Sequence, residues 1–177
     1  MEQLINHSQL MVRQQKEWGE IITGFETKNK YAIVDSQGNQ LYFAVERKGS
    51  WCARQFLKAN RPFELAILNN SGHQVMSVVR PFRFLFPEVT VYDESNKVLG
   101  VVKKKFSIIS KHYCLYDASG KELFTLKGPL LKPWTFNIMQ RDREVGKITK
   151  KWSGLMKESF SDADNTNCIK YLPTCTC

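Results

Sequence analysis

Two carboxylates near the end of the chain are the side chains with the clearest potential for chemistry. Asp162 and Asp164 stand two residues apart, as at the first positions of a calcium-binding loop, and Ser161 and Asn165 could add oxygen ligands. Calcium takes about six to eight oxygens, and this group with nearby carbonyls supplies fewer. Many Asp-x-Asp pairs bind no metal, so a polar loop after the last strand is the ordinary alternative. The spacing alone therefore indicates at most a weak calcium site.

Basic residues form two stretches that could bind an anionic partner. The chain has 26 Lys and Arg against 17 Asp and Glu, a net charge of +9. Each lysine beside an anionic membrane contributes on the order of 1 kcal/mol, and the same charges could contact nucleic-acid phosphates. A solvated strand face is the ordinary alternative for either stretch alone, and the overall charge favours an anionic partner. The stretches are Lys103–Lys105 and the later group of Lys147, Lys150, Lys151 and Trp152.

Motifs of known enzyme classes are missing from the sequence. It has no G-x-S-x-G, no P-loop, no H-E-x-x-H and no glycine-rich dinucleotide fingerprint. Its five cysteines are irregularly spaced and do not indicate a disulfide framework. Cys175 and Cys177 are candidates for acylation, with two free thiols as the alternative, and Thr174 rules out a C-a-a-X box. We expect neither a catalysed reaction nor a small-molecule substrate.

Short strands and tight turns must position these residues. Asp or Asn precedes a Gly or Asn at turns that start at positions 35, 69, 93 and 117, and the last three starts are 24 residues apart. Asp and Asn bond to their own backbone in such turns, and Gly or Asn tolerates the left-handed position. Apolar strands follow the turns, as in Val75–Val79 and Val98–Val102. About ten strands without intervening helices indicate an all-β closed barrel or sandwich.

The two ends of the chain break this pattern. Residues 1–20 are predicted to form a helical segment, residues 21–161 the β-barrel, and residues 162–177 a polar tail without a strand. The sequence shows no secretory signal, and no apolar stretch reaches the roughly 18 to 20 residues that span a bilayer. It therefore predicts a chain that lies on a membrane rather than crossing it. The helical prediction rests on one apolar face formed by Leu4, Ile5, Met11, Val12 and Trp18.

Several longer motifs occur in a characteristic order. Arg61–Leu65 and Arg80–Arg83 are paired Arg-Pro-Phe segments on either side of an Asn-x-x-Gly hairpin, and Thr23–Tyr31 precedes them. Gly146–Gly154 then runs into Phe160–Asn165. Over roughly residues 1–165 this order resembles the phospholipid scramblase family of the scramblase/Tubby-like superfamily.

The resemblance implies a Tubby-like barrel of about twelve strands around a central, apolar C-terminal helix. It also implies calcium-stimulated, non-specific movement of phospholipids between leaflets, with calcium bound by a loop that begins at Asp162 and Asp164. Palmitate on cysteine clusters would make the protein a lipoprotein at the cytoplasmic face of the plasma membrane, with cytosol and nucleus as further locations. Anionic phospholipid headgroups would contact Arg61, Arg80, Arg83, Lys147, Lys150, Lys151 and Trp152.

The sequence departs from the family pattern in two places. After Asn165 the family continues into an apolar calcium loop and the central helix, whereas this sequence continues Thr-Asn-Cys-Ile-Lys. We therefore expect the central helix to be missing, as in a truncated isoform. Phe84-Leu85-Phe86 replaces a cysteine-rich stretch, which excludes dense palmitoylation there. These three residues could dip into a membrane interface, and a buried strand start is the more ordinary interpretation.

Two other functions remain open from the sequence. One is a Tubby-like interaction module that binds anionic lipid, DNA or protein partners without moving lipid. The other is a regulatory isoform that lacks its core helix and associates with a full-length partner.

Overall fold

The structure, a computed structural model, describes residues 7–15, 30–48, 62–132, 135–151 and 166–171. Every regular element in these ranges is a β-strand, and no helix occurs among them. The all-β prediction is therefore confirmed. The twelve strands are β1 Gln9–Gln15, β2 Lys30–Val34, β3 Gln40–Lys48, β4 Phe63–Leu68, β5 Gln74–Arg80, β6 Glu88–Asp93, β7 Val98–Lys105, β8 Ser110–Asp117, β9 Glu122–Pro129, β10 Thr135–Gln140, β11 Arg143–Lys151 and β12 Thr166–Tyr171.

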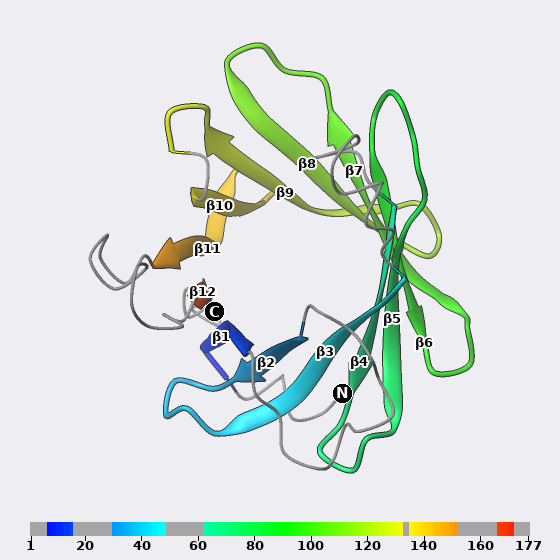
Figure 1. Cartoon of the computed structure of the whole chain (residues 1–177). Helices are drawn as coiled ribbons and strands as arrows, with labels where there is room; N and C mark the ends of the chain where they lie inside the picture. The colour runs from blue at the N-terminus through cyan, green and yellow to red at the C-terminus, as the bar shows by residue number, and fades with distance from the viewer. Residues whose placement is uncertain (1–6, 16–29, 49–61, 133–134, 152–165, 172–177) are drawn as a thin grey trace.

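The strands close into a barrel. Each strand pairs antiparallel with its neighbours in the chain, and β1 pairs with both β2 and β12. Figure 1 shows the resulting ring, with the first and last strands side by side. Closure leaves none of the described strands with an edge that lacks a backbone partner, which is how antiparallel barrels avoid edge-to-edge association. The predicted closed barrel of about twelve strands is confirmed.

The predicted N-terminal helix over residues 1–20 is wrong where the structure describes it. Gln9–Gln15 form strand β1, with Leu10 buried at 8% exposure. Met11 pairs with Val34 on one side and with Cys168 on the other. A short apolar pattern does not distinguish a helix from a strand. Here two open strand edges need a partner, and this requirement outweighs the helical spacing.

The predicted polar tail over residues 162–177 is also wrong in part. Thr166–Tyr171 form strand β12, which pairs with β11 from Lys151 to Gly146 and with β1. The barrel therefore extends beyond residues 21–161 at both ends. The segment has little strand character of its own, and its conformation follows from the backbone groups that β11 and β1 offer to it.

Four turns at one end of the barrel repeat the same hydrogen bonds, as the sequence predicted. In the first, Asp35 Oδ1 accepts from the backbone N–H groups of Gln37 and Asn39 at 2.8 and 2.9 Å. The turns at Asn69, Asp93 and Asp117 form the equivalent pair of bonds at 2.9 to 3.0 Å. A residue with positive φ follows in each turn, namely Gly38, Gly72, Asn96 and Gly120. We call this end of the barrel the turn end.

Two of these turns should make the stability of the barrel depend on pH. The side-chain amide of Asn39 is the main group that lowers the pKa of Asp35 below 3.8, and the Ser119 hydroxyl does the same for Asp117. A lowered pKa in the folded state means stabilisation that is present above the unfolded pKa and lost as pH falls through the folded one. We expect acid titration of the free energy of unfolding to show this loss. In the double variant Asp35→Asn and Asp117→Asn, less stability should be lost on acidification. Asn69 shows that an asparagine forms the same turn without a charge. An unchanged acid limb in that variant would contradict the assignment.

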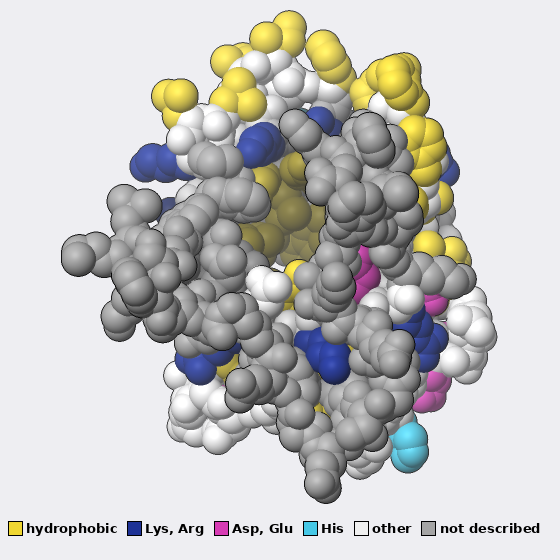
Figure 2. All heavy atoms as spheres, viewed as in Figure 1, with side chains coloured by type: hydrophobic (Ala, Val, Ile, Leu, Met, Phe, Trp, Pro, Cys, Tyr) yellow, Lys and Arg dark blue, Asp and Glu magenta, His cyan; other side chains and the backbone are white. Residues whose placement is uncertain are grey.

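One side of the sheet is apolar around the whole ring. Figure 2 shows hydrophobic side chains lining the hollow at the centre of the molecule. Most of these side chains are only half-buried, although Tyr42, Ala44 and Ile67 form a buried cluster among them. This side therefore lines the interior, and charged strand residues such as Lys103 and Lys147 lie on the other. The apolar partners are Val12 with Ile33, Ala44 with Ile67, Val78 with Val91, Val102 with Leu115, Tyr113 with Leu126, Phe136 with Ile148, and Ile169 with Leu10.

Candidate functional site

The end of the barrel opposite the turns gathers basic side chains. Because neighbouring strands are antiparallel throughout, the connections β5–β6, β7–β8 and β9–β10 all lie at this end. They comprise residues 81–87, 106–109 and, in the described part, 130–132. The Lys104 N–H donates to the Pro87 carbonyl at 3.3 Å, and Ser110 pairs with Pro129. The three loops are therefore neighbours, and we call this end the loop end.

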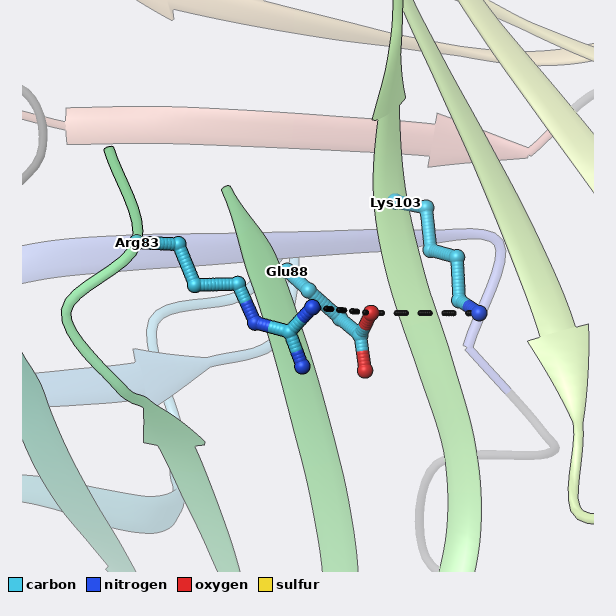
Figure 3. Close-up of polar contacts among 3 residues, drawn as sticks. All are labelled: Arg83, Glu88 and Lys103. Atoms are coloured by element: carbon cyan, nitrogen blue, oxygen red, sulfur yellow. Dashed lines mark ion pairs between the residues drawn. The ribbon is translucent and has the colours of Figure 1, made fainter. Parts of the chain in front are cut away.

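A carboxylate at the loop end links two basic side chains (Figure 3). Glu88 Oε2 lies 3.5 Å from Arg83 Nη1 and 3.8 Å from Lys103 Nζ. Both basic side chains are about half exposed, so neither ion pair adds much to stability. One negative charge against two positive charges leaves the cluster cationic. The two ion pairs hold the β5–β6 loop beside β7, and the net charge of the cluster stays positive.

The aromatic ring of Tyr116 lies close to two lysine ammonium groups beside this cluster. The Nζ atoms of Lys103 and Lys105 each lie 5.7 Å from the centroid of the Tyr116 ring. A cation over an aromatic face is attracted by the ring quadrupole. A side-chain hydrogen bond with Tyr116 is the main cause that raises the pKa of Lys105. Lys103, Lys104 and Lys105 are all exposed, so this stretch presents three ammonium groups to solvent.

The structure brings some of the predicted anion-binding residues together. Arg80 ends β5, with its guanidinium carbon 4.8 Å from the Phe63 ring centroid, and Arg83 follows in the β5–β6 loop. Both therefore lie at the loop end. Lys150 and Lys151 are in the last part of β11, which runs toward the same end. Lys147 is exposed earlier in β11, opposite Asn137, and is separated from β7 by three strands.

Seven predicted site residues lie outside the described ranges. Among the residues that the structure does describe, no group of three or more His, Cys, Asp or Glu side chains could hold a metal ion. The calcium and acylation sites therefore stay predictions. The seven residues are Arg61, Trp152, Asp162, Asp164, Asn165, Cys175 and Cys177.

The interpretation of Phe84-Leu85-Phe86 as a buried strand start is wrong. Their exposed fractions are 80%, 68% and 55%. Strand β5 ends at Arg80 and β6 begins at Glu88, so these residues belong to the loop between them. Phe86 has a φ of 54°, which fits a turn rather than a strand. Their exposure is compatible with the alternative, contact with a membrane interface.

The sequence did not reveal Glu88 and Tyr116 as parts of the site. Glu88 is the first residue of β6, and its pairing with Lys103 depends on the β6–β7 register. Tyr116 is brought beside Lys103 and Lys105 by the β7–β8 register. Short-range sequence patterns do not show which residues of two neighbouring strands pair with each other. The run Phe106–Ile109 directly after three lysines was a local signal that could have indicated an exposed apolar loop.

Two other features are weaker candidates for a site. An open groove of about 950 Å³ at the turn end carries charges of both signs, Lys121, Arg141 and Arg143 with Glu122 and Asp142. It lies where β9 and β10 diverge, since these strands pair only from Thr125 to Lys127. Because the groove carries charges of both signs, its charge does not indicate which class of ligand would bind.

The Cys114 thiol is the second weaker candidate. Its Sγ atom lies 3.8 Å from His112 Nε2 and 4.0 Å from Thr125 Oγ1. The Thr125 hydroxyl in turn donates to Glu122 at 2.8 Å and is the main cause that lowers the pKa of Glu122. Cys114 is buried at 3% exposure, so no substrate reaches the thiol.

Comparison with known proteins matches the chain to one family by its sequence profile and by individual relatives. The sequence profile of the family described as Scramblase matches residues 1–170. Mouse phospholipid scramblase 1 is 37% identical, over 93% of this chain and 54% of its own length. The human phospholipid scramblase 1 is 31% identical, over 93% and 56%. Human phospholipid scramblase family member 5 is 30% identical, over 88% and 62%. The chain spans about half the length of the first two relatives.

A solved structure supports the fold. A protein from Arabidopsis thaliana is similar with a TM-score of 0.50 and 15% identity, over 93% of this chain and 82% of that one. This likeness bears on the Tubby-like barrel fold alone. Within the described residues, no helix has the length and apolar character needed to cross a bilayer.

Proposed function

The chain belongs to the scramblase family, and on this premise we propose that it mediates or regulates the movement of phospholipids between membrane leaflets. The movement is bidirectional and stimulated by calcium. Relatives that share about a third of its residues are named phospholipid scramblases, which supports a phospholipid membrane as the place of action. The cytoplasmic face of the plasma membrane is the proposed location, and no covalent chemistry is involved.

The basic loop end is the observation that carries this proposal. Arg83 and Lys103–Lys105 are exposed, and Glu88 compensates only part of their charge. Phospholipid headgroups offer phosphates, and anionic lipids add net negative charge at the same depth. Each lysine or arginine near such a surface contributes about 1 kcal/mol. Four exposed cations on neighbouring elements therefore provide peripheral attachment.

Calcium stimulation is proposed through the acidic segment of Asp162 and Asp164 with Asn165. Oxygen ligands of this kind suit calcium, and a site with few ligands binds weakly and responds only to high concentrations. Calcium at this position would also lower the negative charge near anionic headgroups. Cys175 and Cys177 are the proposed acylation sites. These two elements of the proposal rest on sequence.

Leaflet exchange in proteoliposomes tests the proposed function. Fluorescent phospholipid in vesicles that contain the intact chain should become accessible to an external quencher faster than in protein-free vesicles. Added calcium should accelerate it further, and the double variant Asp162→Asn and Asp164→Asn should remove the acceleration. Mouse phospholipid scramblase 1 serves as the comparison protein. Exchange at the protein-free rate with and without calcium would overturn the proposal.

A second candidate function is an interaction module without lipid transport. The exposed Lys103–Lys105 stretch favours it, because these ammonium groups suit the phosphates of DNA as well as those of lipids. Competition between vesicles and duplex DNA at matched salt separates the two partners. Preferential DNA binding together with absent leaflet exchange would support this second candidate.

A further inference from the structure

Large apolar side chains project from all three described loops at the loop end. Of the ten large hydrophobic residues that are exposed in the described part of the chain, nine lie in these loops, and only Leu123 lies elsewhere. Monomeric proteins rarely concentrate exposed apolar side chains in this way unless the surface meets a partner. The nine are Phe82, Phe84, Leu85 and Phe86 in the first loop, Phe106, Ile108 and Ile109 in the second, and Leu130 and Leu131 in the third.

The three loops form one continuous surface. The hydrogen bond from Lys104 to Pro87 joins the first loop to the end of β7, just before the second loop, and Ser110, just after the second loop, pairs with Pro129, just before the third. In Figure 2 hydrophobic side chains gather along the upper edge of the molecule, with lysine and arginine side chains below them. The tips are the most exposed residues, with Ile109 at 86% and Leu131 at 96%.

A basic belt lies directly behind these tips. Segments 80–88, 103–112 and 127–132 contain eight lysines and arginines and one acid, Glu88. Apolar tips followed by a cationic layer match the depth profile of a membrane interface, where acyl chains lie beneath anionic headgroups. The eight basic residues are Arg80, Arg83, Lys103, Lys104, Lys105, Lys111, Lys127 and Lys132.

We propose that these three loops insert their apolar tips into the acyl region of a membrane that carries anionic phospholipids. The basic belt then lies at the level of the headgroups, and the turn end points away from the membrane. This inference rests on the proposed function only in taking a phospholipid membrane as the partner. Nucleic acid has no apolar phase to receive isoleucine and leucine tips, so the bilayer fits the surface better.

Lipid-monolayer penetration tests the insertion. The intact chain, injected beneath a monolayer with phosphatidylserine, should raise the surface pressure. The triple variant Phe84→Ser, Ile109→Ser and Leu131→Ser should lose this rise, and its partitioning to vesicles in high salt should fall at least about thirtyfold. Leu123→Ser at the turn end is the matched control and should behave as the unmodified chain. Equal penetration by the triple variant and the unmodified chain would overturn the inference.

A folding check and a second variant keep this test decisive. Circular dichroism and thermal unfolding establish whether the triple variant folds. If it does not, Leu131→Ser alone, at the most exposed position, should give a smaller loss of penetration. Self-association that the serine substitutions abolish, without any change in penetration, would assign the tips to contacts between two copies and overturn the inference.

Insertion and leaflet exchange can fail separately. Penetration without leaflet exchange would retain the inference and remove the proposed function. Leaflet exchange with penetration that is insensitive to the serine substitutions would retain the proposed function and overturn the inference.

Discussion

Replacing Lys103, Lys104 and Lys105 together with glutamine should weaken binding to anionic vesicles about a hundredfold at low salt. Each lysine near an anionic surface contributes on the order of 1 kcal/mol, and all three lysines lie in the last part of β7, at the loop end. All three side chains are exposed, so glutamine removes charge without opening the core. Vesicle sedimentation with increasing phosphatidylserine measures the effect. Raised salt should narrow the difference between the variant and the unmodified chain, since screening weakens exposed charges.

Two control variants test whether the effect depends on the sign of the charge and on its place in the barrel. Glu88→Gln removes the only acid of the basic belt and should strengthen binding several-fold. Lys97→Gln together with Lys121→Gln removes two exposed charges from the turn end and should change binding little. Equal losses from the turn-end variant and from a matched loop-end variant, Lys103→Gln together with Lys105→Gln, would show that only net charge matters. That result would contradict the assignment of the loop end as the membrane-binding surface.

Leu68→Ala should lower the free energy of unfolding by about 2 to 5 kcal/mol. Leu68 is 1% exposed and belongs to a buried cluster with Phe43, Val45 and Ala66. Truncation removes apolar contacts and leaves a cavity beside β4 that neighbouring strands cannot fill, because their backbones are fixed by pairing on both sides. A loss of this size is a large part of the stability of an ordinary domain.

Urea unfolding at equilibrium, followed by tyrosine and tryptophan fluorescence, measures this loss. Leu123→Ala is the matched control, since Leu123 is 40% exposed, and its change should stay within about 0.5 kcal/mol. Similar losses in the two variants would mean that the buried cluster around Leu68 is not the stabilising core.

The tight turns could be predicted because their chemistry is local. An Asp or Asn oxygen bonds to backbone groups two and four residues later, and the fourth residue of the turn needs a left-handed conformation. Both requirements are visible within five residues of sequence. The strands between the turns follow from alternation, as at Phe136 and Ile138 in β10. Barrel closure then follows from many short strands without helices.

Strands β1 and β12 could not be predicted because their conformation depends on distant partners. Gln9–Gln15 and Thr166–Tyr171 pair with each other although they lie at opposite ends of the sequence. Neither segment has a strong alternation, and one has a helix-like spacing. What makes them strands is the pair of open edges at β2 and β11, which exists only after the rest of the barrel has formed.

The sequence indicated several residues of the candidate site, but it did not show how they are arranged in space. Arg80 and Arg83 were recognised as candidates, and Lys103–Lys105 as a basic stretch, yet Glu88 and Tyr116 join them only through strand register. The exposure of Phe84-Leu85-Phe86 was also missed, because an apolar run after a strand is usually buried. A loop is distinguished from a strand only when both flanking strand ends are known.

Equilibrium binding of the intact chain to lipid vesicles decides whether this barrel works at phospholipid membranes. Vesicles of phosphatidylcholine alone are compared with vesicles that also contain phosphatidylserine, each with and without calcium. We expect binding that rises steeply with phosphatidylserine, falls with salt, and weakens about a hundredfold when Lys103–Lys105 are replaced by glutamine. Absence of binding to both vesicle types at low salt, with the barrel folded, would show that the loop end does not act at a membrane.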